Sequence, residues 1–252
     1  MEIAILTVGD EVLAGDIENT NASWVARQMA DRGATVTRIL TLPDDESLIT
    51  KWVGRWQATF DAVVVIGGLG GTHDDVTMDA VADAFGRELV VEAAVRQDVV
   101  ATARAYEEAN PELFEDTDGL ELDVDAWAAT PAGAEPLINT VGLSPGCVVE
   151  NVFVFPGPPD ELKSMFEQVA DRFDGAVTST MLYTGTPEGM MTDVFDSLSD
   201  RFDVTVGSYA SRGETPNRIK LSGTDEETLN AAVEWLFENA DVANDPSAVR
   251  FD

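Results

Sequence analysis

Positive charge is the scarcest property of this sequence. Its 252 residues contain 15 lysines and arginines against 47 aspartates and glutamates, which gives a formal net charge of −32. The lysines are Lys51, Lys163 and Lys220. Nucleic acids and anionic membranes are bound through basic patches, so we expect neither as a partner. Because the Debye length falls to about 3 Å at 1 M salt, concentrated salt would screen this charge, and we predict a halophilic archaeal source.

Cysteine, histidine and long apolar runs are equally sparse. Cys147 stands alone, which excludes an intrachain disulfide and a cysteine zinc cluster. No apolar stretch reaches the length of a membrane span, and the chain enters a strand at Glu2 without a basic or apolar leader. We therefore expect a cytoplasmic protein. His73 is the single histidine, and we interpret it as an exposed loop residue, because a metal-bound water becomes acidic without a histidine.

Apolar periodicity predicts an α/β protein with a doubly wound, mainly parallel sheet. The hydrophobic content of 44% suffices for one medium domain and a smaller second one. Strands and helical stripes alternate, and that order favours parallel strands with helices on both faces. The expected strands are 3–8, 36–42, 62–66 and 152–155. Apolar stripes at helical spacing lie at 22–29, 48–56 and 78–85. Two further helices are expected, one at 92–109 and one that follows Pro158 and ends near residue 173. Trp52 and Trp56 have core spacing on one of these stripes.

Two domains are expected, at residues 1–172 and 176–252. The second is predicted to be a small α+β domain, with helices near 187–201 and 225–239. We interpret Arg212 and Arg218 in it as part of a solvated hairpin. An acidic segment, "PELFEDTDGLELDVDAWAAT", lacks periodicity and is predicted to be a loosely structured excursion from the first domain.

A glycine loop follows the third expected strand in "VVVIGGLGGTHDDVT". Glycines at a strand end let backbone N–H groups approach a phosphate. The loop does not match a Walker A motif, which needs a lysine, nor a dinucleotide fingerprint, which needs glycine where His73 stands. The loop therefore predicts an anion site built from backbone.

Three acidic pairs each follow a strand directly, namely Asp10-Glu11, Asp44-Asp45 and Asp74-Asp75. The carboxyl ends of parallel strands share one edge of the sheet, which is where ligands bind. Carboxylates repel phosphate unless a divalent cation bridges them. The pattern predicts a phosphorylated ligand with Mg²⁺, Mn²⁺ or Co²⁺ on carboxylate oxygens. The alternative is that each pair only caps the helix that follows it.

Five motifs resemble one family in order and spacing. The chain is similar to the N-terminal domain of the competence/damage-inducible CinA family, which has the molybdopterin-binding fold of MoaB and Mog. The resemblance covers residues 1 to about 172, and the region from 176 looks like the small domain that follows it there. We expect no nicotinamide mononucleotide deamidase domain, which many CinA proteins carry at the C-terminus. The motifs are "TVGDEVLAGDIENTNASWVARQMADRGATV", "LPDDES", "GGLGGTHDDVT", "NTVGLSPG" and "FPGPPDELKSMF".

The resemblance implies a ligand pocket and the residues that act in it. Asp75 and either Asp44 or Asp45 are the implied catalytic residues, and the same three are the candidate metal ligands. The implied activity is metal-dependent hydrolysis of ADP-ribose or a related nucleotide diphosphate. Adenylyl transfer to molybdopterin, or a non-catalytic molybdopterin- or nucleotide-binding regulatory module, are the alternatives. His73 stands where relatives often have proline or a basic residue.

The predicted ligand-binding set combines the glycine loop with the strand ends around it. It comprises Gly9, Asp10, Glu11, Asn21, Gly67, Gly68, Leu69, Gly70, Gly71, Thr72, Asp74, Thr77, Gly146, Pro156 and Gly157. The expected partner is a small nucleotide or pterin, with molybdopterin one candidate. We also expect a homo-oligomer, either a dimer or a trimer.

Overall fold

The computed structural model describes residues 1–113, 122–211 and 215–249. The chain forms two compact units, Met1–Asp174 and Gly175–Asp252. The sequence predicts this division between residues 172 and 176. Within the described ranges, no helix is both long enough and apolar enough to cross a bilayer.

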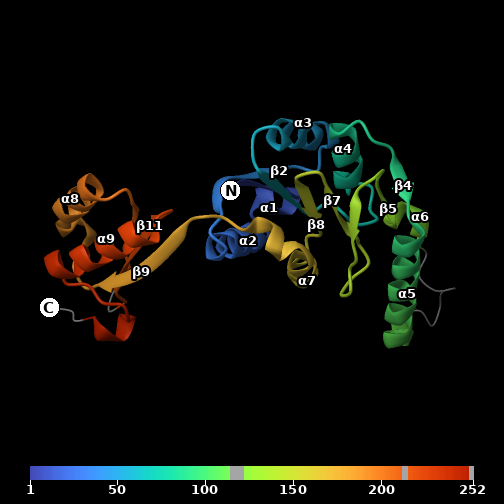
Figure 1. The fold of residues 1–252 in the computed structure, drawn as a ribbon. Helices are drawn as coiled ribbons and strands as arrows, with labels where there is room; N and C mark the ends of the chain where they lie inside the picture. Colours follow the sequence, from blue (N-terminus) through green and yellow to red (C-terminus); the bar gives the residue numbers. More distant parts are fainter. Residues whose placement is uncertain (114–121, 212–214, 250–252) are drawn as a thin grey trace. The chain divides into compact units, whose positions relative to one another are not determined.

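A six-stranded sheet forms the centre of the first unit (Figure 1). Four neighbouring strands are parallel, the fifth pairs antiparallel with the fourth, and the sixth pairs antiparallel with the fifth, so the mainly parallel sheet is confirmed. In spatial order the strands are β2 (Thr35–Leu42), β1 (Glu2–Val8), β3 (Ala62–Ile66), β8 (Val152–Phe155), β7 (Gly146–Val149) and β6 (Glu135–Leu137).

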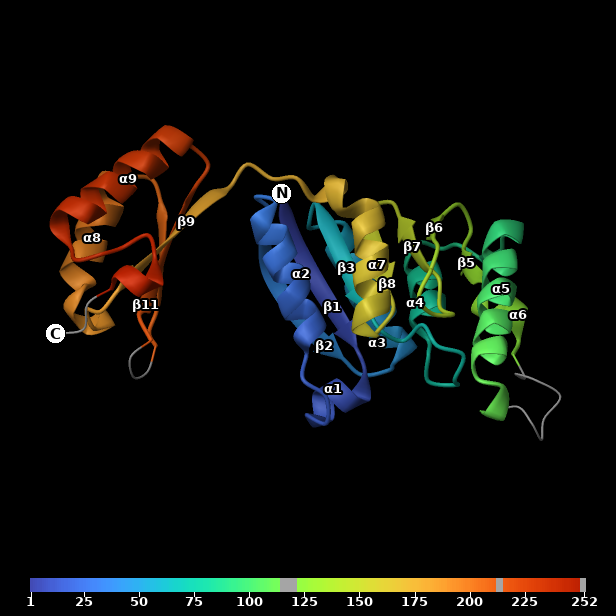
Figure 2. The same ribbon diagram turned by 90° about the horizontal axis from the view of Figure 1, so that it is seen from below.

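Helices cover both faces of this sheet. α2 (Thr20–Asp31) and α7 (Pro159–Val169) pack on one face, with the 3₁₀ turn η2 (Ala170–Phe173) continuing from α7. α3 (Glu46–Gln57) and α4 (Thr77–Ala84) pack on the other, as Figures 1 and 2 show. The sheet thus separates two hydrophobic cores, and alternate side chains of β1 point into one or the other. Ile3 and Ile5 pack in the first core with α2 and α7, whereas Ala4 and Leu6 pack in the second core with α3 and α4. The doubly wound arrangement is therefore confirmed.

The second core contains two tryptophans and the single cysteine. Trp52 and Trp56 pack in the second core with their ring centroids 5.5 Å apart, which confirms a structural position. Cys147 is fully buried, and burial raises the pKa of its thiol to about 12. The thiol is therefore protonated and unsuited to act as a nucleophile.

The acidic excursion is more ordered than its sequence indicates. A small layer holds α5 (Ala93–Ala109), η1 (Pro111–Leu113), α6 (Val124–Trp127) and the antiparallel pair β4 (Leu89–Val91) and β5 (Ala129–Pro131). Trp127 and Leu122 pack against the buried Val95 and Val99 of α5. This corrects the prediction for the end of the segment, and residues 114–121 lie outside the described chain.

The parallel strands end in register at one edge. Val8 pairs with Leu42, Thr7 with Ile66, and Ile66 with Phe155. The loops that follow these strands therefore begin side by side. The acidic pair that follows β1 begins the short helix α1 (Asp10–Ala14) and occupies its first turn.

The second unit contains a three-stranded antiparallel sheet in the order β10-β11-β9. Two helices pack on it around a core that includes Leu182, Leu221 and Leu236. Arg218 lies over the ring of Tyr209 at 5.5 Å on the strand pair, whereas Arg212 lies outside the described residues. The elements are β9 (Thr178–Thr184), η3 (Glu188–Met190), α8 (Thr192–Arg201), β10 (Thr205–Tyr209), β11 (Asn217–Gly223), α9 (Glu226–Asn239) and η4 (Pro246–Ala248).

Candidate functional site

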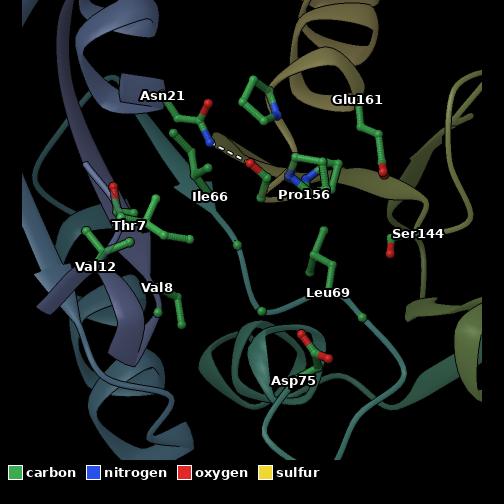
Figure 3. A pocket seen from close by; sticks show the side chains of 18 of the residues that line it. Thr7, Val8, Val12, Asn21, Ile66, Leu69, Asp75, Ser144, Pro156 and Glu161 are labelled. Carbon is green, nitrogen blue, oxygen red and sulfur yellow. Dashed lines mark hydrogen bonds between the residues drawn. The ribbon is translucent and has the colours of Figure 1, made fainter. Parts of the chain in front are cut away.

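A cavity of about 760 Å³ opens at the shared strand edge of the first unit. Its walls are the ends of β1, β3 and β8, the first residues of α2 and α7, and the segments around Trp127 and 141–144 (Figure 3). Asn21 Nδ2 donates to the Gly157 carbonyl at 2.6 Å across this edge. The contact joins the start of α2 to the turn before α7. Because helices carry positive potential at their N-termini, their position here favours an anionic ligand.

The glycine loop is fixed at both ends and leaves donors free between them. Gly67 N–H donates to Phe155 O at 3.0 Å, and Thr77 N–H donates to Gly68 O at 3.1 Å. Gly68 has φ of 68°, and a side chain there would clash with Thr77 Oγ1. No hydrogen bond within the described residues uses the backbone N–H of Gly68, Leu69 or Gly70. All three residues line the cavity, so these N–H groups are available to an oxyanion.

Asp75 is not the cap of α4. The N-cap position of that helix is Val76, which makes no side-chain cap. The Asp75 carboxylate instead accepts hydrogen bonds from the backbone N–H of Thr72, at 3.1 Å, and from the Thr72 hydroxyl. It lies against Gly70, where a side chain would clash with it. The capping alternative is therefore wrong for Asp75, and its carboxylate is held at the cavity wall.

The structure separates the two aspartates after β2. Asp45 caps α3, since its Oδ1 accepts from Leu48 N–H at 3.0 Å. The hydrogen bond from the Ser47 hydroxyl, followed by that from Leu48 N–H, lowers the pKa of Asp45. Asp44 lines the cavity, and its Oδ2 accepts from Asp10 N–H at 2.9 Å. Asp44 is thus the candidate functional residue, and Asp45 is a capping residue.

The cavity wall is acidic. No lysine, arginine or histidine of the described chain lines it, whereas six carboxylate residues do: Glu11, Glu18, Asp44, Asp74, Asp75 and Glu161. Removal from water is the main cause that raises the pKa of Asp44, and the charges of Asp10, Glu11 and Asp74 add to it, while the Asp10 N–H opposes it. The ionised form of Asp44 is therefore disfavoured, and a bound cation would relieve that cost.

A divalent cation fits this site only together with a ligand. In the part of the chain that is described, no group of three or more His, Cys, Asp or Glu side chains is arranged to hold a metal ion. The predicted trio of metal ligands is thus corrected, because Asp45 is engaged as a cap. Asp44 and Asp75 still line the same cavity. Mg²⁺ is commonly held by one or two carboxylates and completed by phosphate oxygens and water, and this pair suits such an ion.

Six of the predicted site residues do not line the cavity. They are Asp10, Asp45, Gly71, Thr72, Thr77 and Gly146. Asp10 contributes its N–H to Asp44, and Thr72 donates to Asp74 and Asp75. Gly71 lies against the Trp127 indole.

The last two of these residues are buried beneath the site. Thr77 is fully buried, and its Oγ1 has no hydrogen-bond partner among the described residues. Gly146 lies within β7, where a side chain would meet the Val154 carbonyl and Met165. Both therefore support the loop or the sheet rather than contact a ligand.

The remaining predicted residues lie on the cavity wall together. They are Gly9, Glu11, Asn21, Asp44, Gly67, Gly68, Leu69, Gly70, Asp74, Asp75, Pro156 and Gly157. His73 is not among the lining residues, and its side chain is 99% exposed, which confirms the expected surface position. Its Nδ1 lies 3.9 Å from Asp74 Oδ1. The hydrogen bond from the Thr72 hydroxyl is the main cause that lowers the pKa of Asp74.

Sequence reasoning missed one side of the cavity. Tyr106, Trp127, Leu143, Ser144 and Glu161 all line it. Two of the quoted motifs contain Leu143, Ser144 and Glu161, so these three residues could have been predicted from the resemblance. Tyr106 and Trp127 come from α5 and α6, and only tertiary packing brings them to the loop.

Comparison with known proteins gives consistent matches. The model of a family described as "Probable molybdopterin binding domain" matches residues 4–174. A protein of Archaeoglobus fulgidus is 36% identical over 243 residues, covering 94% of this chain and 97% of its own length. A Clostridium botulinum protein described as competence-damage inducible is 31% identical over 245 residues, covering 92% of this chain but 58% of that longer protein.

Two solved structures were also found to be similar. The CinA protein of Thermoplasma acidophilum, described as of unknown function, has a TM-score of 0.57 and 27% identity, and covers 69% of this chain and 99% of its own. The molybdopterin biosynthesis enzyme MoaB of Thermus thermophilus is a more distant match, at 16% identity and a TM-score of 0.41 over 68% of this chain and 89% of its own.

Proposed function

This chain belongs to the family of probable molybdopterin binding domains, and from that premise we propose that its cavity binds a nucleotide or a pterin through phosphate groups. The observation that carries the proposal is the set of unused N–H groups on Gly68, Leu69 and Gly70. Such groups are costly to leave without a partner unless water or a ligand satisfies them. A backbone N–H group forms a stronger hydrogen bond with a charged phosphate oxygen than with a neutral acceptor.

We propose that the reaction is hydrolysis of a diphosphate of the ADP-ribose type. Asp44 and Asp75 would hold Mg²⁺, Mn²⁺ or Co²⁺, which supplies charge neutralisation and a more acidic water when bound. The glycine loop holds a phosphate by its N–H groups, and Asp75, fixed by Thr72, positions the attacking water. The water adds to one phosphorus and loses a proton to the solvent, and the other phosphate leaves with the bridging oxygen.

Adenylyl transfer to molybdopterin is the second candidate. The description of the matched family favours it, whereas the volume of the cavity, which lies in the range that buries a whole organic ligand, suits both candidates. In hydrolysis water attacks ADP-ribose and a sugar phosphate leaves, whereas in transfer a pterin phosphate attacks ATP and pyrophosphate leaves. A binding module without catalysis is the third candidate. The oligomeric state and the halophilic source stay predictions from the sequence.

Product analysis tests these candidates directly. We expect the purified protein, in concentrated KCl with Mg²⁺, to convert ADP-ribose to AMP and ribose 5-phosphate, and chromatography of the mixture would measure both products. ATP with molybdopterin is the parallel incubation. Release of pyrophosphate only in that second mixture would replace hydrolysis by transfer. A protein that binds ADP-ribose but forms no product in either mixture would be a binding module.

A further inference from the structure

Glu161 lines the cavity on the side opposite the aspartate that is proposed to position water. It belongs to the first turn of α7 and projects into the cavity, whereas Asp75 lies at the other wall (Figure 3). No salt bridge to Glu161 is present within the described residues. Its charge is therefore not neutralised by a side chain of the described chain.

The Glu161 carboxylate is held in place by an asparagine that is only 1% exposed. Asn139 Nδ2 donates to Glu161 Oε2 at 2.6 Å and to Ser144 O at 2.9 Å. Asn139 Oδ1 accepts from the N–H groups of Val141 and Gly142, at 3.0 and 2.8 Å. Both donors and both acceptor sites of this amide are thus in use, and they fix the loop and the carboxylate together. Residues that contact a ligand are typically supported by a second layer of this kind.

The Glu161 carboxylate has acceptor capacity left for a ligand. An ionised carboxylate offers about four lone-pair sites on its two oxygens, and the hydrogen bond from Asn139 uses one of them. Burial raises the pKa of Glu161, and the Asn139 hydrogen bond opposes the rise, so the ionised form is kept at a cost that a donor on the ligand would reduce. The ligand group that contacts Glu161 should therefore donate hydrogen bonds and carry no negative charge.

A nucleoside diphosphate has one group that fits this requirement twice. Its phosphates would be repelled, and the edge of adenine alternates an amino donor with ring acceptors. The 2′ and 3′ hydroxyl groups of a ribose are two adjacent donors, and carboxylates accept from ribose hydroxyl groups in dinucleotide-binding folds. Val141 and Leu143, on either side of Gly142, line the same wall, and their apolar surface suits a base attached to that ribose.

We propose that Glu161 is a specificity residue that accepts hydrogen bonds from the 2′ and 3′ hydroxyl groups of a nucleoside ribose. The proposal rests on the proposed function, and it narrows the ligand from any organic diphosphate to a ribonucleoside diphosphate or its sugar ester. The phosphates would then extend from this ribose toward the glycine loop.

Titration calorimetry with ADP and 2′,3′-dideoxy-ADP in the presence of Mg²⁺ tests the proposal. We expect the full chain to bind ADP at least about tenfold more tightly, since losing one hydrogen bond to a charged group typically has an effect of this size. Glu161→Gln keeps the shape and an acceptor for Asn139 but removes the charge. Because hydrogen bonds to an ionised group are roughly twice as strong as neutral ones, it should reduce a tenfold preference to about threefold. Its affinity for the dideoxy analogue should stay within about twofold of the wild-type value.

A matched control lies on the same helix. Glu167 is exposed and does not line the cavity, so Glu167→Gln should keep the full preference for ADP. Equal affinities for ADP and the dideoxy analogue in the wild-type protein, or a preference that Glu161→Gln leaves unchanged, would overturn the role of Glu161 and leave the proposed function standing. Failure of the wild-type protein to bind either nucleotide would overturn both.

Discussion

Asp75→Asn is expected to lower turnover of ADP-ribose by about 10² or more, as the loss of one electrostatic contact in an active site typically does. The carboxylate lines the cavity, and it accepts hydrogen bonds from Thr72 rather than from the start of α4. Asparagine has nearly the same shape and retains an acceptor for Thr72. The substitution therefore removes the charge and leaves the loop in place. Initial rates with Mg²⁺ measure the effect.

Asp45→Asn is the matched control for this experiment. Asp45 caps α3 from outside the cavity, and asparagine caps a helix as well as aspartate. We expect wild-type turnover and an unchanged unfolding midpoint. Without a cation, Asp75→Asn should bind nucleotide as tightly as the wild-type protein or more tightly, since a repulsive charge is gone. Wild-type turnover in Asp75→Asn would leave Asp75 a structural role and make Asp44 the candidate for the chemistry.

Gly70→Val is expected to weaken ADP binding by at least about 10²-fold. A side chain at Gly70 would clash with the Asp75 carboxylate and cover the neighbouring N–H groups. Losing two charge-assisted hydrogen bonds at about 1.5–3 kcal/mol each corresponds to a change of this size. Unlike Gly67 and Gly68, Gly70 does not have a left-handed backbone conformation, so valine does not force an unfavourable φ there. Calorimetry with Mg²⁺ measures the affinity.

Gly54→Ala provides a control for the loss of glycine itself. Gly54 lies within α3, and its nearest neighbour, Ala84 O, is 3.9 Å from the added Cβ. Alanine is a better helix former, so this variant should be at least as stable and should bind ADP normally. A folded Gly70→Val protein with wild-type affinity would show that the ligand does not contact the loop backbone.

The fold of the first unit follows from local patterns in the sequence. The fully buried run Ala62–Ile66 reads as a strand, and helical stripes such as Ile49, Val53 and Trp56 recur at the helical period. Alternation of these elements leaves few topologies open, so the shared strand edge could be inferred as well. The short helices α1 and α6 could not, because four or five residues carry too little periodicity.

The site was only partly predictable, for reasons that differ between residues. Asp44 and Asp45 both follow β2, and only the backbone geometry of the cap shows which carboxylate is engaged. Trp127 reaches the glycine loop at Gly71 by tertiary packing, for which no local pattern exists. Glu161 lies in a quoted motif, but the orientation of its carboxylate depends on a hydrogen bond from Asn139, which is 22 residues away in the sequence.

The central claim is that a phosphate on the glycine loop is tolerated beside Asp44 and Asp75 because a divalent cation joins them. Calorimetry of the wild-type protein with the α,β-methylene analogue of ADP-ribose, whose bridging carbon blocks hydrolysis, tests it most directly. The account predicts binding with Mg²⁺ at least about 10²-fold tighter than with EDTA, since removing the cation leaves the carboxylates facing phosphate. Equal affinity with Mg²⁺ and with EDTA would contradict it.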